Sequence, residues 1–69
     1  MDAQKALKAV MKHKRITQHK LAETLGKPYN TVRNTLYGSN MKIETLTEMA
    51  DALGCDVVLR DRKTGKLYR

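Results

Sequence analysis

The sequence predicts a mainly α-helical domain of four to five helices, followed by a short C-terminal β-hairpin or strand. Three observations lead to this prediction. Apolar residues recur at helical spacing through residues 3–53. Gly26 and Gly54 each follow the last apolar residue of such a segment, where helices commonly end. From residue 55 onward the composition changes to strand-forming residues and a glycine-containing turn.

The first predicted helix begins after Asp2, a good capping residue, and ends near residues 13–15. Its apolar stripe consists of Leu7, Val10 and Met11. A second helix is expected over residues 18–25, with Thr17 as its cap. Its buried stripe consists of Leu21, Ala22 and Leu25. Gly26 would close this helix in a left-handed conformation, which glycine adopts easily because it has no side chain.

Pro28 places a third helix close behind the second, because its fixed φ suits the first turn of a helix. Val32 and Leu36 share the face that we expect to be buried. The opposite face contains no acidic residue and consists of Asn30, Arg33, Asn34 and Tyr37. A fourth helix is closed by Gly54. Its predicted stripe consists of Ile43, Leu46, Met49, Ala50 and Leu53.

The chain is expected to have two parts, a helical part at residues 1–54 and a β-ribbon at residues 55–69. Strand formers at residues 57–59, a turn at 61–65 and a return at 66–69 predict the ribbon. An isolated two-stranded ribbon is hardly stable in water. The ribbon should therefore pack on the fourth helix or pair with another chain as a dimerisation element.

The charge of the chain indicates a polyanionic partner, since the formal net charge is +7 and the pI is near 9.9. Residues 3–43 hold nine cations and a single acid, Glu23. From residue 44 onward, five acids offset five cations. We therefore expect the nucleic-acid contact surface in the first two thirds of the chain. An ordinary solvated face is the alternative for the lysines of the first helix.

Two short helices joined by a tight glycine turn form a unit that can place the second helix in the major groove of DNA. The run TQHKLAETLGKPYNTVRNTLYGSN, followed by IETLTEMADALG, resembles the phage-repressor and Cro-like (XRE) helix-turn-helix family. The resemblance covers roughly residues 5 to 54. It rests on the joint spacing of Thr17-Gln18, Leu21-Ala22, Leu25-Gly26, Val32, Gly38 and residues 50–54. It implies a lambda-repressor-like bundle and a DNA-binding transcriptional regulator.

The resemblance also implies roles for individual residues. Base edges would be contacted by Tyr29, Asn30, Arg33 and Asn34. Arginine can bond both acceptors of guanine, and asparagine can bond the donor and acceptor of adenine. Phosphates would be contacted by Lys14, Arg15, Thr17, Gln18, Thr31, Tyr37, Ser39, Asn40 and Lys42. Tyr29 also projects close to Val32, so a place in the core is an equal alternative for its ring.

Other chemistry finds little support in the sequence. His13 and His19 do not share a helical face, and with one cysteine they cannot form a normal metal site, so no metal or cofactor is expected. Cys55 is interpreted as a small buried or strand residue, with a redox-sensing thiol as the alternative. No catalytic motif is present, which indicates a protein that is not an enzyme. A single cysteine and the lack of a membrane-length apolar run predict a soluble, cytoplasmic protein without a membrane partner.

The resulting hypothesis is a homodimer that binds double-stranded DNA at a palindromic operator as a repressor. The third helix of each copy would enter the major groove of one half-site, with the half-sites about 34–36 Å apart. Two alternatives remain from other classes. One is an antitoxin or controller-type regulator that also binds a partner protein. The other is a protein-binding inhibitor that kept the fold and lost DNA binding.

Overall fold

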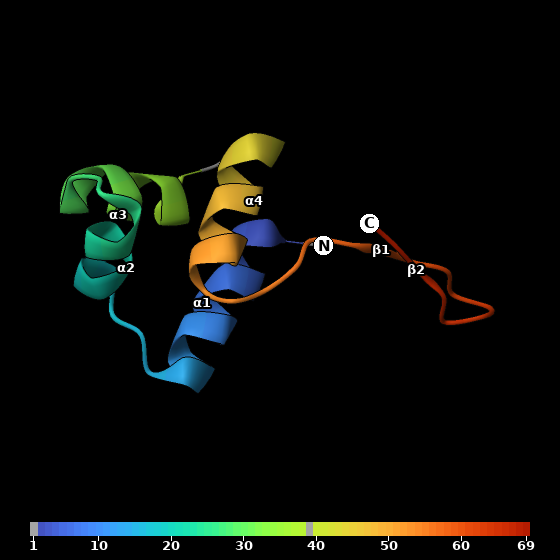
Figure 1. Cartoon of the computed structure of the whole chain (residues 1–69). Coiled ribbons are helices and arrows are strands. Elements are labelled where there is room, and N and C mark those ends of the chain that lie inside the picture. Colours follow the sequence, from blue (N-terminus) through green and yellow to red (C-terminus); the bar gives the residue numbers. More distant parts are fainter. Residues whose placement is uncertain (1, 39) are drawn as a thin grey trace.

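The computed structural model describes residues 2–38 and 40–69. Within these residues, four helices precede a two-stranded antiparallel hairpin (Figure 1). The helices are α1 (Ala3–Lys14), α2 (Gln18–Leu25), α3 (Tyr29–Tyr37) and α4 (Ile43–Ala52). The strands are β1 (Leu59–Arg60) and β2 (Leu67–Tyr68). The predicted fold, a mainly helical domain with a C-terminal hairpin, is confirmed.

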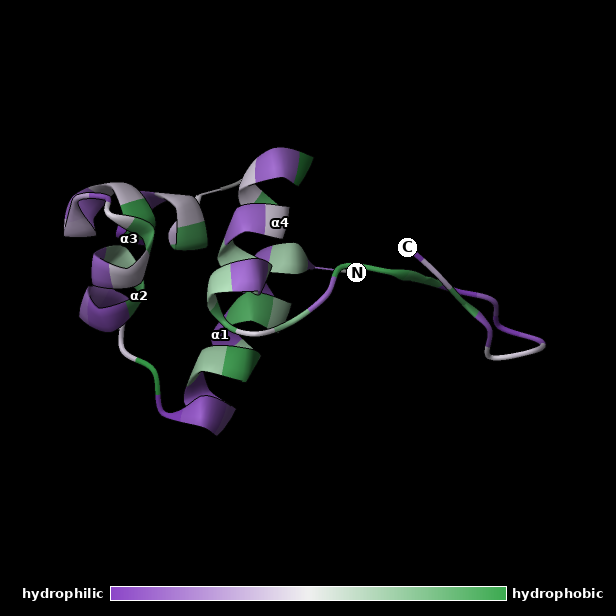
Figure 2. Ribbon diagram, viewed as in Figure 1, coloured by the Kyte–Doolittle hydropathy of each residue, from purple (hydrophilic) through white to green (hydrophobic). Residues whose placement is uncertain are grey.

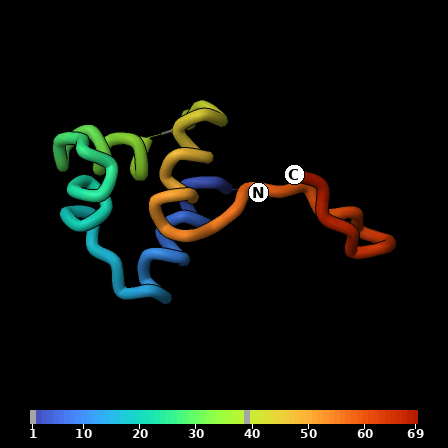
Figure 3. The backbone as a smooth tube through the Cα atoms, viewed as in Figure 1, coloured from blue at the N-terminus to red at the C-terminus, as the bar shows by residue number. Residues whose placement is uncertain are grey.

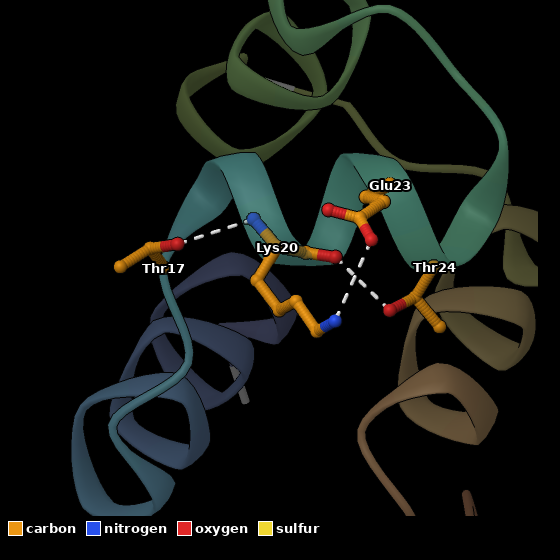
Figure 4. A network of polar contacts seen from close by, with 4 residues as sticks. All are labelled: Thr17, Lys20, Glu23 and Thr24. Atoms are coloured by element: carbon orange, nitrogen blue, oxygen red, sulfur yellow. Dashed lines mark hydrogen bonds and ion pairs between the residues drawn. The ribbon is translucent and has the colours of Figure 1, made fainter.

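Side-chain caps fix the start of the first two helices, as the sequence predicts. Asp2 accepts a hydrogen bond of 3.0 Å from the amide three residues later, and Thr17 accepts one of 3.1 Å from the amide of Lys20. Figure 4 shows the second cap together with the polar contacts around it. The Lys20 ammonium lies 3.6 Å from a carboxylate oxygen of Glu23, and the Thr24 hydroxyl donates to the Lys20 carbonyl. These contacts hold the first turn of α2 in place.

Left-handed residues end α1 and α2. Gly26 has φ 66° and closes α2 as predicted. Arg15 closes α1 with φ 58°, a conformation that costs a residue with a side chain roughly 1–2 kcal/mol. The prediction for Pro28 was wrong by one position, because Pro28 is the N-cap of α3 and has an extended ψ of 144°. The φ of proline suits an extended residue as well as a helical one.

The hydrophobic core lies between the four helices, and hydrophobic and hydrophilic segments alternate along each of them in Figure 2. It is formed by Leu7, Met11, Leu21, Ala22, Val32, Leu36, Leu46, Met49, Ala50 and Leu53. Ile43 was predicted to join this core and is instead 64% exposed. Residue 43 lies at the edge of the apolar stripe and is also the first residue of α4, so no neighbouring helix covers it.

The hairpin extends away from the helices, as Figures 1 and 3 both show. The carboxylate of Asp61 accepts hydrogen bonds from the amides of Lys63 and Thr64, and Gly65 has φ 76°, so the predicted turn is present. Within the described part of the chain, neither strand packs against a helix. The strands therefore do not cover α4 in their own subunit. None of the described helices has the length and hydrophobicity needed to cross a membrane.

Candidate nucleic-acid interface

The two faces of α3 differ completely in burial. Val32 and Leu36 are both 0% exposed, whereas Asn30, Arg33 and Asn34 on the other side are exposed. Within residues 2–38 and 40–69, these three polar side chains make no hydrogen bond or ion pair. No acidic residue occurs anywhere in α3. The outer face of α3 therefore offers free donors and acceptors to a partner without repelling an anion.

The ring of Tyr29 lies at the N-terminal end of this face and stacks on His19 of α2. The ring centroids are 4.0 Å apart, and the ring planes differ by 7°. Tyr29 is half-buried and does not belong to the core cluster, so it does not act as a core residue. The stacking holds the phenol ring at the edge of the outer face of α3. His19 has no place in the predicted site, and only the packing of two helices reveals its role.

The side chain of Tyr37 lies at the C-terminal end of α3, where two other helices hold it. The Gln18 amide nitrogen donates a hydrogen bond of 3.3 Å to the Tyr37 hydroxyl. The Lys8 ammonium lies 4.3 Å from the centroid of the Tyr37 ring. The ring remains 61% exposed. Because Gln18 and His19 are adjacent, the first turn of α2 contacts the aromatic side chains at both ends of α3 and fixes its orientation.

The family of the chain follows from the match to a family model. The model of the Cro/C1-type HTH DNA-binding domain matches residues 6–58. The chain belongs to this family. Nothing among curated proteins or solved structures matches it. In this Cro/C1-type domain, α2 and α3 correspond to the helix-turn-helix segment that the sequence resemblance identifies. The match supports DNA-binding transcription regulation, and the family is typically non-enzymatic.

The residues predicted to contact phosphate do not form one cluster in the Cro/C1-type domain. The structure brings Gln18 and Tyr37 together, whereas Lys14 lies elsewhere and its ammonium donates a hydrogen bond of 2.7 Å to the carbonyl of Leu53. Lys14 therefore bonds the C-terminal end of α4, where the helix dipole favours a cation. This contact could not be predicted from sequence patterns, because the two residues are 39 positions apart.

The other predicted phosphate contacts lie at helix ends or on exposed positions. Thr17 and Arg15 are the cap residues already described. Thr31 and Asn40 are exposed, and Lys42 is the exposed N-cap of α4. The prediction for Ser39 falls outside the described residues. The members of this set therefore come from the α1–α2 connection, both ends of α3 and the start of α4.

The ionisable residues divide the Cro/C1-type domain into a basic and an acidic part. Helices α1, α2 and α3 contain one acidic residue, Glu23, which forms an ion pair with Lys20. By contrast, α4 contains three acids and no base. One of these acids, Glu48, lies 3.1 Å from the ammonium of Lys27 in the α2–α3 turn. The positive potential that would attract DNA therefore belongs to α1, α2 and α3. In the described ranges, no group of His, Cys, Asp and Glu could hold a metal ion.

Proposed function

We propose that this chain is a sequence-specific transcriptional regulator of the repressor type that inserts α3 into the major groove of double-stranded DNA. One observation carries the proposal: Asn30, Arg33 and Asn34 lie exposed on a face without acids, while the opposite face of the same helix is fully buried. A helix held in this way can enter the major groove without loss of core packing. Arginine favours guanine and asparagine favours adenine, so this face can discriminate between base pairs.

Two helix N-termini support phosphate contacts beside the groove. Asp2 and Thr17 cap α1 and α2, whereas the N-caps of α3 and α4 form no side-chain cap hydrogen bond. The first amides of a helix lack partners within the helix and attract anions. Lys42, the N-cap of α4, adds a positive charge at one of these ends. The starts of α3 and α4 are therefore suited to bind the phosphates that flank the bases.

A dimer on a palindromic operator fits a domain of this size. One copy presents a single recognition helix of nine residues, which covers only a few base pairs. Two copies related by a two-fold axis would place their α3 helices in successive turns of the major groove, about 34–36 Å apart. The operator would then repeat its half-site with the same symmetry.

Selection of bound sites from random duplex DNA by the full-length protein tests this proposal. We expect a consensus with two-fold symmetry, bound at least about a thousandfold more tightly than random sequence at physiological salt. Anisotropy titrations of the selected and a scrambled duplex provide the two affinities. Binding that depends on salt but does not enrich any sequence would contradict recognition by α3, because electrostatic attraction alone is independent of sequence.

The Tyr37→Phe variant is expected to weaken DNA binding evenly. Since the Gln18 amide donates to the Tyr37 oxygen, the phenolic proton is free to point outward to a phosphate. Loss of one such hydrogen bond should lower the affinity of each half-site roughly two- to tenfold. The selected and scrambled duplexes should lose affinity by the same factor, with an unchanged salt dependence. An altered base preference in Tyr37→Phe would contradict the phosphate assignment.

A further inference from the structure

The exposed side of α4 contains a shallow groove that differs in charge from the rest of the chain. We call it the α4 groove. Its lining includes four acids (Glu44, Glu48, Asp51 and Asp56), one cation (Arg69) and the apolar side chains of Ile43 and Val57. Two of its acids have partners, since Glu48 faces Lys27 and Asp56 faces Arg69. Glu44 and Asp51 form no ion pair within the described part of the chain. The α4 groove thus combines unpaired negative charge with the exposed apolar side chain of Ile43.

The hairpin carries a net positive charge, opposite to that of the α4 groove, and it has exposed apolar side chains. Between residues 59 and 68 it carries four cations and one acid, Asp61, which is bonded within the turn. Leu59 is 77% exposed and Tyr68 is 52% exposed. These two residues lie opposite each other in the antiparallel pair, so their side chains share one face of the ribbon. Figure 2 shows hydrophobic colour along the strands and hydrophilic colour around the turn.

Within the described residues, the two strands pack on no helix of their own subunit, although Val57 and Arg69, which flank the strands, line its α4 groove. Figures 1 and 3 show the hairpin leaving the helices and pointing away from α4. A two-stranded ribbon with no packing partner is marginal at best in water. The strands thus lack a partner in their own subunit, and the α4 groove of a second copy has the complementary charge.

We propose that two copies of this chain exchange their hairpins, each hairpin docking in the α4 groove of the other copy. In such a dimer, the Leu59–Tyr68 face covers Ile43, and the cations of the turn, among them Arg62 and Lys63, face the unpaired acids. The exchange is reciprocal, so it closes with two-fold symmetry and does not continue into a filament. The inference rests on the dimer of the proposed function and specifies which surfaces form it.

This arrangement leaves the recognition helix free. The hairpin leaves the bundle on the side opposite α2 and α3, as Figure 1 shows. The residues that line the α4 groove do not include Asn30, Arg33 or Asn34, so a hairpin docked there leaves these side chains exposed. The same docking neutralises the acidic part of each subunit, which otherwise repels DNA. The two-fold axis of the exchange would also be the axis that relates the two α3 helices.

Charge reversal on each surface tests the exchange in the full-length protein without DNA. We compare Glu44→Lys/Asp51→Lys, Arg62→Glu/Lys63→Glu and the combination of all four by sedimentation equilibrium at about 0.1 M salt. Each double variant should weaken the dimer at least tenfold, and the fourfold variant should return to within about threefold of the wild type. Glu44 lies in the first turn of α4 and Asp51 in the last, so effects on the helix dipole oppose each other.

Two further variants serve as controls for the charge-reversal experiment. Lys20→Glu/Glu23→Lys reverses an exposed ion pair on α2 and should leave the dimer unchanged. Glu44→Gln/Asp51→Asn removes the two charges with little change in shape, and it should weaken the dimer about threefold even if the reversed variant does not fold. Circular dichroism establishes the helical content of each protein.

A wild-type protein that remains monomeric, or a dimer insensitive to the groove acids, would overturn the exchange. A fourfold variant as weak as either double variant would overturn it as well. Base selection by α3 is measured separately, with DNA and with the Arg33 variant. A failure of the exchange is therefore distinguishable from a failure of the proposed function, because the first alters association without DNA and the second alters sequence preference.

Discussion

Replacement of Arg33 by alanine is expected to abolish base preference at one position of each half-site. The guanidinium is exposed on α3 and makes no hydrogen bond or ion pair in the part of the chain that the structure describes, so it is free to bond a base. A bidentate contact between arginine and guanine contributes about 1–3 kcal/mol of discrimination. The difference in affinity between the selected site and its single-base variants at that position should shrink by this amount. Competition titrations with the variant duplexes measure the difference.

Lys42→Ala is the appropriate comparison for Arg33→Ala. Lys42 is exposed at the start of α4, where we expect a phosphate, and its removal should weaken binding to all sequences alike. The slope of log affinity against log salt should fall by about one. Lys14 is less suitable, because its ammonium already bonds the carbonyl of Leu53 and its removal would also destabilise α4. Equal losses on every duplex from both variants would show that Arg33 does not contact a base.

The sequence predicted α2 to the residue, because both ends of this helix depend on local chemistry. The hydroxyl of Thr17 and the left-handed conformation of Gly26 act within a few positions of the chain. The predicted burial of Ile43 was wrong because it depends on tertiary packing and not on local chemistry. Helical periodicity shows which side of α4 is apolar, but it does not show how far the neighbouring helices extend along it. The burial of a residue at the end of a helix depends on that tertiary boundary.

In the candidate site, too, the features set by helical periodicity could be predicted, whereas the contacts between helices could not. The outer face of α3 follows from the helical period, and Asn30, Arg33 and Asn34 are exposed as that period predicts. The stacking of His19 on Tyr29 could not be predicted, since it depends on the angle between α2 and α3. The same holds for the bond from Gln18 to Tyr37, which joins residues 19 positions apart. Their contacts with DNA remain predictions.

The core variant Leu36→Ala is expected to lose most of the stability of the domain. Leu36 is 0% exposed and lies on the buried face of the helix whose other face we assign to DNA. Truncation of a buried leucine costs about 2–5 kcal/mol, through lost transfer free energy and the remaining cavity. A domain of 69 residues has a free energy of unfolding of roughly 3–10 kcal/mol. Urea unfolding followed by circular dichroism should show a much lower midpoint, with part of the population unfolded in buffer.

Ile43→Ala provides the matched control, because it removes the same number of carbon atoms from a position that is 64% exposed. In dilute protein its free energy of unfolding should change by less than about 0.5 kcal/mol, since alanine favours the helix and little buried area is lost. A large loss in Ile43→Ala, or a small one in Leu36→Ala, would mean that the core is centred elsewhere. In that case the inner face of α3 would not be anchored, and the outer face could not be held rigidly enough to discriminate between bases.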